Sequence, residues 1–87
     1  MKTPQTHSIG RSLLEIHARL ATLTRREGEV LEYVVARKLK KQIAGELGTV
    51  EQTVKIHRAH VMEKMGAKSV AELVRLMERC QITGSLQ

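Results

Sequence analysis

The sequence predicts an all-α protein built around a helix-turn-helix. Two observations carry this prediction: capping patterns stand before separate amphipathic runs, and no strand-like alternation of apolar and polar residues competes with them. In each pattern a Ser or Thr precedes a Glu or Gln by three residues, so the two side chains can satisfy free backbone donors of a first helical turn. The three patterns are Thr24 with Glu27, Thr49 with Gln52, and Ser69 with Glu72.

The N-terminal part is expected to be a tail followed by a lead-in helix. Residues 1–8 are polar and include the one proline of the chain, which favours a disordered segment. Helical spacing then relates Ile9, Leu13, Ile16 and Leu20 and predicts a helix that ends near Ala21. We therefore assign residues 1–22 to a disordered tail and a linker helix.

The next helix is expected to open at Thr24 and to end near Arg37. Its apolar stripe consists of Val30, Leu31, Val34 and Val35. Because these side chains recur at three and four residue intervals, they share one face of the helix and predict a contact with the core.

The segment from Lys41 to His57 predicts two helices that meet across a very short turn. Gly48 follows an apolar face and is the residue best able to adopt the positive φ that ends a helix, so the first helix should stop at Leu47. The small Ala44 lets the two backbones approach, and Val54 is placed to pack against it. An ordinary helical hairpin also fits these residues, because the motif tolerates many sequences.

The last helix should begin after Ser69, once Gly66 has closed the preceding one. Its main stripe consists of Val70, Leu73, Val74 and Met77. Leu76 lies off this stripe, so we expect apolar surface outside the monomer core that could pair with a second copy; a single surface leucine is the simpler alternative. The domain would span residues 23–82, with residues 83–87 as a C-terminal tail.

The second helix of the pair carries two contrasting faces. At about 100° per residue, Val50, Val54, Val61 and Met65 share a core side. The opposite side carries Gln52, Lys55, Ile56, Ala59 and Glu63, and one flank carries Thr53, His57, His60 and Lys64. Amide and amine groups can bond base edges in a major groove, and an apolar side chain can touch a thymine methyl group. Ile56 could equally be an isolated surface residue, and His57 a hydrogen-bonded residue at the edge of the core.

The net charge of +6 is concentrated around this helix pair. The cations are Arg37, Lys38, Lys40 and Lys41 before it, and Lys55, Arg58, Lys64 and Lys68 within and after its second helix. Such a cluster attracts polyanions and gives an affinity that falls steeply with salt. A solvated charge run is the alternative when the cluster is considered by itself.

Composition argues against several other classes of protein. No run approaches the roughly 20 apolar residues of a membrane span, and the N-terminus lacks the apolar segment of a signal peptide, so we expect a cytoplasmic protein without a membrane partner. The single Cys80 cannot form an internal disulfide or begin a zinc site, and it reads as a small apolar residue. No nucleophile and base pair, phosphate-binding glycine loop or metal cluster is evident, so neither an enzyme nor a cofactor is expected.

From Leu23 onward the chain resembles the LuxR/FixJ-type (GerE-like) DNA-binding output domain of bacterial response regulators. The matching pieces are LTRREGEVLEYVVA at 23–36, KQIAGEL at 41–47 and TVKIHRAHVMEKMGAKSVAELVR at 53–75. HARLATL at 17–23 is similar to the linker of FixJ-type regulators. The resemblance implies a four-helix domain after a lead-in linker helix, with the third helix, about residues 50–65, in the major groove and the fourth supporting dimerisation on a two-fold related site.

The resemblance and the helical wheel together give the candidate interface residues. Those expected at DNA are Lys41, Gln52, Thr53, Lys55, Ile56, His57, Arg58, Ala59 and Lys64. Those expected at a dimer contact are Leu73, Leu76, Met77 and Cys80. The implied partners are double-stranded DNA, a second copy of the chain, RNA polymerase and a receiver domain.

Three residues depart from the family pattern. Arg37 stands where the family commonly has Gly, Lys40 where it has Asn, and Val50 where it usually has Ser. A different and more basic connection between the first two helices is therefore expected, and Thr49 could cap the recognition helix one residue early.

The main hypothesis is sequence-specific DNA binding that regulates transcription. The alternative is a protein-interaction module that binds a regulator or receiver domain and has weak DNA affinity. Glu51 and Glu63 favour the alternative because carboxylates oppose phosphates, although a Glu can also accept a hydrogen bond from cytosine.

Overall fold

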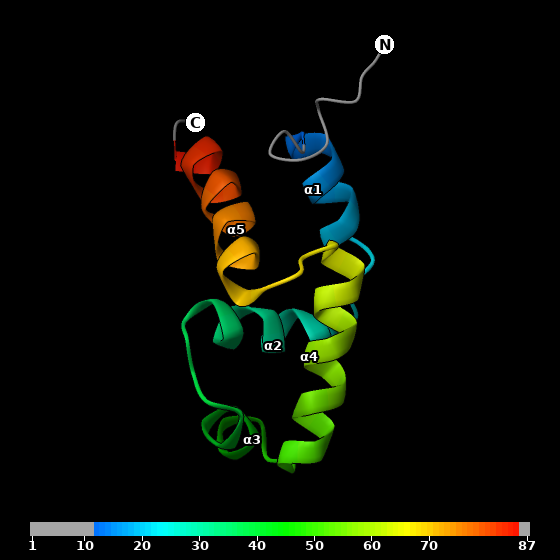
Figure 1. The fold of residues 1–87 in the computed structure, drawn as a ribbon, viewed down its shortest axis with the longest axis vertical. Coiled ribbons are helices and arrows are strands. Elements are labelled where there is room, and N and C mark those ends of the chain that lie inside the picture. Colours follow the sequence, from blue (N-terminus) through cyan, green and yellow to red (C-terminus); the bar gives the residue numbers. More distant parts are fainter. Residues whose placement is uncertain (1–11, 86–87) are drawn as a thin grey trace.

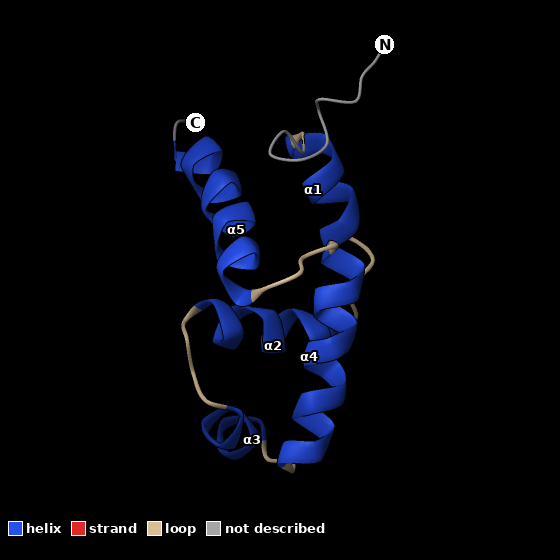
Figure 2. Cartoon of the chain, viewed as in Figure 1, coloured by secondary structure: helices blue, strands red, loops and turns tan. Residues whose placement is uncertain are grey.

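The computed structural model describes residues 12–85, with side chains up to Cys80. These residues form five helices and no strand (Figures 1 and 2). The helices are α1 Leu13–Leu20, α2 Arg25–Val35, α3 Lys40–Leu47, α4 Glu51–Met65 and α5 Val70–Ser85. The all-α prediction is confirmed, whereas the expected disordered tail at residues 1–8 and the apolar position Ile9 lie outside the described residues.

Helix α4, the longer of the two helices in the helix-turn-helix, runs along one side of the molecule (Figure 1). Helix α2 crosses behind it, α3 lies beside its N-terminal end, and α1 and α5 lie beyond its C-terminal end. Both α2 and α3 pack against α4, and α5 packs against α1 and α2. The arrangement leaves one long side of α4 free of other helices.

The core is aliphatic and receives side chains from every helix. Its fully buried members are Ile16, Val30, Ile43, Val54, Val61, Met65 and Leu73. Burial of Ile16 means that α1, expected as a linker helix apart from the domain, shares the domain's core. At the other end α5 continues to Ser85, so the first residues of the expected C-terminal tail are helical.

The predicted N-terminal caps have three different outcomes. The capping box at α2 is confirmed: Thr24 Oγ1 accepts from Glu27 N at 3.1 Å, and Glu27 Oε1 accepts from Thr24 N at 3.0 Å. At α5 the Ser69 hydroxyl accepts from Glu72 N at 3.1 Å, but the Glu72 carboxylate accepts from Lys68 N instead of Ser69 N. The predicted cap of α4 by Thr49 and Gln52 is wrong, because Val50 is the N-cap and no side chain caps the helix.

Three helices end with a residue in the left-handed region. Gly48 (φ 69°) ends α3 and Gly66 (φ 68°) ends α4, as their sequence positions predict. Arg37 (φ 65°) takes the same conformation after α2, where the Arg37 and Lys38 N–H groups donate to the carbonyls of Val34 and Tyr33, both at 3.0 Å. The connection after α2 therefore keeps the turn that a glycine would favour, although an arginine occupies it.

Helix α5 buries a wider face than its main stripe predicts. Leu73 is fully buried and Leu76 is 7% exposed, so the expectation that Leu76 lies outside the monomer core is wrong. The physical reason is that α5 contacts both α1 and α2, and two neighbours cover two adjacent rows of side chains. Leu73 and Leu76 are therefore core residues of the single chain.

Candidate nucleic-acid interface

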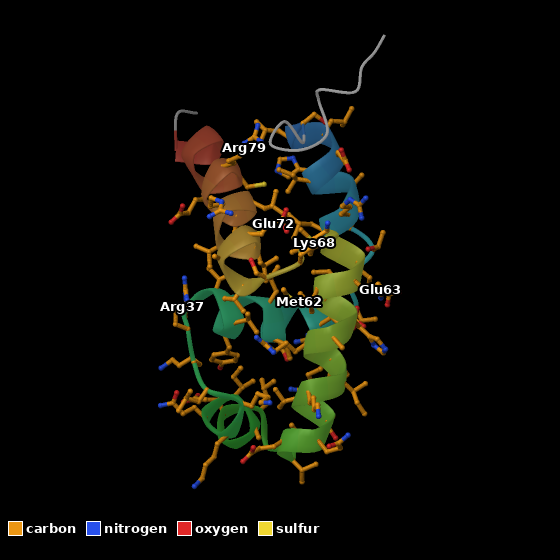
Figure 3. All side chains as sticks on the ribbon, viewed as in Figure 1. Arg37, Met62, Glu63, Lys68, Glu72 and Arg79 are labelled. Carbon is orange, nitrogen blue, oxygen red and sulfur yellow. The ribbon has the colours of Figure 1, made fainter. Side chains whose placement is uncertain are left out.

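Helix α4 separates a buried line from an exposed one. Val54, Val61 and Met65 are fully buried, whereas Gln52, Lys55, Ile56, Ala59 and Glu63 are exposed. Ile56 is 47% exposed and is the large apolar side chain of this otherwise polar face. Figure 3 shows Glu63 on the outer side of α4, directed away from the other helices. This exposed line is the groove face expected from the helical wheel.

Val50 does not join the buried line. It is 62% exposed, with an extended backbone at φ −107° and ψ 159°. The helical wheel placed Val50 in the core only because it extended the helix by one residue, whereas α4 begins at Glu51. The prediction that Val50 is a core residue is therefore wrong.

Polar and basic residues border the groove face. Thr53 and His57 are half-buried on one flank, and Arg58 is half-buried on the other. The Nδ1 atom of His57 is buried and has no hydrogen-bond partner among the described residues. Lys41 is exposed on the first turn of α3. These positions can supply hydrogen bonds and charge to phosphates without reading bases.

The half-buried Lys64 side chain contacts other parts of the protein. Its Nζ atom lies 2.7 Å from Glu27 Oε1 and 3.2 Å from the Thr22 carbonyl oxygen. An approach of Lys64 to a DNA backbone would compete with these contacts, and its place at the interface stays a prediction. No local sequence pattern indicates this ion pair, because Glu27 lies 37 residues away along the chain.

Glu27 is the buried anchor between α2 and α4. It is 4% exposed, and the Lys64 ammonium hydrogen bond, followed by the Thr24 backbone N–H, lowers its pKa from 4.5 to about 2. His60 Nδ1 lies 3.4 Å from the other carboxylate oxygen. The carboxylate therefore stays ionised near neutral pH and fixes α4 relative to the start of α2. The sequence pattern of Thr24 and Glu27 predicted the capping role of Glu27 but not its contact with Lys64.

The linker helix also contacts the end of α4. Arg19 Nη1 donates to the Lys64 carbonyl oxygen at 3.0 Å, and its Nε atom bonds Glu15 at 3.2 Å. A basic side chain near a helix C-terminus satisfies a carbonyl that lacks an intrahelical partner. Helix α1 thus helps to set the position of the groove-facing helix, a role that sequence patterns did not reveal.

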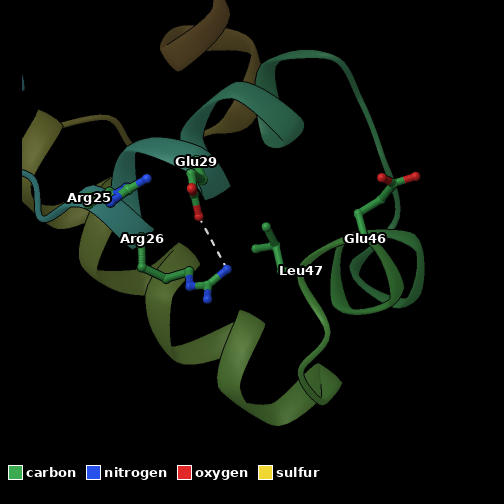
Figure 4. Close-up of a pocket in the computed structure, with 5 residues that line it drawn as sticks. All are labelled: Arg25, Arg26, Glu29, Glu46 and Leu47. Atoms are coloured by element: carbon green, nitrogen blue, oxygen red, sulfur yellow. Dashed lines mark hydrogen bonds and ion pairs between the residues drawn. The ribbon is translucent and has the colours of Figure 1, made fainter.

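A pocket of about 420 Å³ near α2 and α3 carries mixed charge (Figure 4). It is lined by Arg25, Arg26, Glu29, Glu46 and Leu47. Arg26 Nη1 pairs with Glu29 Oε1 at 3.2 Å, so part of the positive charge is already neutralised. This pocket therefore has less attraction for a polyanion than the flanks of α4.

The two remaining candidates for a dimer contact lie at the edge of the core. Met77 and Cys80 are half-buried on α5 and pack against core residues. Burial raises the pKa of the Cys80 thiol, which keeps it protonated and apolar. Both side chains retain more exposed area than Leu73 and Leu76, which are buried.

Other ligand classes find little support in the described part of the chain. Among residues 12–85 no three potential metal-ligating side chains gather at one place. None of the five helices is long and apolar enough to cross a bilayer.

The family model for bacterial regulatory proteins of the luxR family matches residues 21–77. The chain is 41% identical over 75 residues to nodulation protein W of Bradyrhizobium diazoefficiens, covering 86% of this chain and 33% of that protein. It is 52% identical over 62 residues to the transcriptional regulatory protein FixJ of Rhizobium meliloti, covering 71% of this chain and 30% of that protein. The chain thus spans about a third of the length of these relatives.

Solved structures give the same result. Full-length FixJ from B. japonicum superimposes with a TM-score of 0.74 at 41% identity, covering 80% of this chain and 34% of that chain. The response regulator StyR gives a TM-score of 0.73 at 43% identity, covering 75% of this chain and 33% of that chain. Family, relatives and fold identify a DNA-binding output domain of a transcription regulator, not an enzyme. The chain belongs to the luxR family of bacterial regulatory proteins.

Proposed function

We propose that the domain reads a specific duplex sequence through the major groove, with α4 as its recognition helix. Gln52, Lys55, Ile56 and Ala59 would face base edges, and Lys41, Thr53, His57 and Arg58 would hold the backbone. The observation that carries the proposal is the exposed line of α4, where an amide, an amine and a 47% exposed isoleucine lie opposite a fully buried line. Such a face offers both hydrogen bonds and an apolar contact for a thymine methyl group.

The shape of the molecule supports this docking. A helix with its side chains is about 10–12 Å across and the major groove is about 12 Å wide. Helix α4 can therefore fill the groove, provided that no other helix covers its outer side, and none of the described helices does (Figure 1). The N-terminal half of α4 extends past α2, so the bases would meet residues from Gln52 to Ala59.

The wider partners belong to the same proposal. Two copies would bind an inverted repeat in contact through Met77 and Cys80, and the bound pair would contact RNA polymerase in the cytoplasm. A receiver domain attached before α1 would control binding. Support comes from the half-exposed apolar residues on α5 and from similarity to response regulators.

Selection of binding sites from random DNA, followed by affinity measurements across a salt series, tests the proposal. We expect one recovered motif with two-fold symmetry, bound roughly 10³-fold or more tightly than random duplex. Random duplex of the same length and charge is the control. Preference of less than about tenfold for the selected sequence would contradict sequence-specific binding.

A protein-interaction module with weak DNA affinity is the second candidate. The exposed Glu63 on the groove face and the mixed charges of the pocket near α2 and α3 favour it, because they suit a partner with charges of both signs. Glu63→Gln separates the two candidates. Removing a carboxylate near phosphates should strengthen DNA binding, whereas a protein partner that uses Glu63 would be bound more weakly.

A further inference from the structure

A second pocket, of about 260 Å³, lies where α2, α4 and α5 meet. It is lined by Val34, Arg37, Lys38, Arg58 and Val70. Three of the five side chains are cations and none is a carboxylate. The pocket near α2 and α3 instead combines two arginines with two glutamates. The pocket at Arg58 is therefore the more strongly positive of the two.

The charges of this pocket are not neutralised by side chains of residues 12–80. Among these residues Arg37, Lys38 and Arg58 form no side-chain hydrogen bond or ion pair, whereas Arg19, Arg26 and Lys64 each have an acidic partner. Like charges that share a small volume repel one another, and a bound anion relieves that repulsion. Two valines line the pocket beside the charges and add no competing acceptor.

The pocket lies at the flank of α4 that carries Arg58. Arg58 belongs to α4 and stands between the buried line of Val54 and Val61 and the exposed Lys55, at about 100° per residue. Figure 3 shows Arg37 beyond the C-terminal end of α2, on the side of the molecule away from Glu63. A helix that fills the major groove has a phosphate ridge along each flank. The flank that carries Arg58 would bring one ridge toward the pocket.

We propose that this pocket binds a backbone phosphate of the duplex at the edge of the major groove, so that the α2–α3 connection takes part in DNA binding. The inference rests on the proposed function. Two guanidinium groups and an ammonium suit a phosphate. Each planar guanidinium can donate two hydrogen bonds to phosphate oxygens, and the ammonium adds a positive point charge. Such a contact is independent of sequence and contributes affinity and orientation.

Arg37→Gly and Lys38→Ala test the proposal, with Arg75→Ala on the exposed side of α5 as the matched control for charge. Affinities for selected and random duplexes are measured across a salt series. Each pocket variant should bind both duplexes several-fold more weakly and lower the slope of log affinity against log salt by about 0.9, while Arg75→Ala leaves the slope unchanged. Because glycine suits φ 65°, Arg37→Gly should also melt at a higher temperature, which excludes misfolding as the cause of weaker binding.

A scan of the selected duplex with neutral methylphosphonate linkages locates the contact. A methylphosphonate at one position near the edge of the motif should weaken binding by the wild type. The same substitution should have little further effect on binding by Arg37→Gly. Equal losses for wild type and variant at every linkage would place the phosphate elsewhere and overturn the proposal.

The salt slopes separate the two hypotheses. Unchanged slopes for both pocket variants would overturn the pocket contact while leaving sequence-specific binding in place. If the wild type shows no preference for the selected duplex, the proposed function is contradicted. The salt slopes of the wild type and the pocket variants on random duplex would then still show whether the pocket contacts a phosphate. Weaker binding of the variants to polyglutamate, with unchanged binding to DNA, would assign the pocket to an acidic protein and overturn the proposal.

Discussion

Lys55 and Lys41 are both exposed cations, but they lie on different parts of the proposed interface. Lys55 stands in the exposed line of α4, and Lys41 stands on the first turn of α3. A lysine that bonds a base edge contributes to discrimination, whereas one that meets a phosphate contributes affinity for any sequence. The two lysines therefore allow base reading and backbone binding to be measured separately.

We expect Lys55→Ala to reduce the difference in binding free energy between the selected and the random duplex by about 1–3 kcal/mol. Lys41→Ala should weaken binding to both duplexes and lower the salt slope by about one. Fluorescence anisotropy on the two duplexes across a salt series measures both effects. Equal, sequence-independent losses for the two variants would remove Lys55 from base reading.

Val50 occupies the N-cap of α4 with an extended backbone and no polar atom to offer. The N-cap side chain normally accepts a hydrogen bond from one of the first free N–H groups of the helix, and valine cannot do so. Because Val50 is largely exposed, replacing it removes little apolar burial.

Val50→Ser should raise the free energy of unfolding by about 0.5–1 kcal/mol, because serine can cap the first turn. Urea unfolding followed by circular dichroism measures the change, and Val50→Ala, which lacks a cap as valine does, is the control. A serine variant no more stable than the alanine variant would show that the cap bond does not form.

At the scale of elements, the attachment of α2 to α4 depends on one buried carboxylate. Glu27 is held by Lys64 at 2.7 Å and by the Thr24 N–H at 3.0 Å, and its pKa is lowered to about 2. The folded state thus favours the ionised form over the value of 4.5 for a free glutamate. This stabilisation is full above pH 4.5 and disappears as the pH falls toward 2.

The wild type should lose stability as the pH falls from 4.5 to 2, because Glu27 becomes protonated. Glu27→Gln should not show this loss, because glutamine does not titrate. At neutral pH the variant should be less stable by about 3 kcal/mol, as a lowering of this size implies at roughly 1.4 kcal/mol per pH unit. Unfolding free energies at several pH values test this, with Glu32→Gln on the exposed side of α2 as the control. Parallel pH profiles for wild type and Glu27→Gln would exclude Glu27 as the titrating group.

Helix α1 is attached to the domain by packing as well as by Arg19. Ile16→Ala should lower the free energy of unfolding by about 2–5 kcal/mol, because a fully buried isoleucine leaves a cavity when it is truncated. Leu14→Ala is the control, since Leu14 is 81% exposed on the same helix. Similar thermal stabilities of the two variants would mean that α1 does not contribute to the core in solution.

Sequence patterns predicted elements better than contacts between elements. Thr24 with Glu27, Gly48 and Gly66 specify helix ends through bonds within a few residues, so their sequence was sufficient. Leu76 was misplaced, and the contact of Lys64 with Glu27 was missed, because their surroundings come from α1 and α2, which are distant in the chain. Val50 was misplaced because one residue of error at a helix start moves a side chain by about 100° around the helix.

For the whole molecule, the apolar area on α5 decides how two copies could meet. Leu73 and Leu76 are used within one chain, which leaves Met77 and Cys80 as the half-exposed apolar residues of the expected dimer set. A contact of this size is small, so we expect the pair to form on DNA, where the duplex holds both copies close together.

Met77→Glu should reduce affinity for a duplex with two half-sites while leaving affinity for one half-site unchanged. The added carboxylates would repel each other across the two-fold axis and would have to be desolvated. Sedimentation on both duplexes measures the stoichiometry, with Ala71→Glu on the exposed face of α5 as the control. Undiminished cooperative binding by Met77→Glu would exclude this residue from the pairing surface.

The bond from Arg19 to the Lys64 carbonyl makes α1 and the groove-facing helix thermodynamically dependent on each other. Any event that lifts α1 away from the domain must break this bond and expose Ile16, and it thereby changes the freedom of α4 to fit a duplex. Linkage requires the converse to the same degree: a duplex that favours one position of α4 shifts the docking equilibrium of α1. If operator DNA favours the position of α4 that this bond holds, we expect it to stabilise the docking of α1, so that protection of the α1 amides from hydrogen exchange rises when the duplex binds.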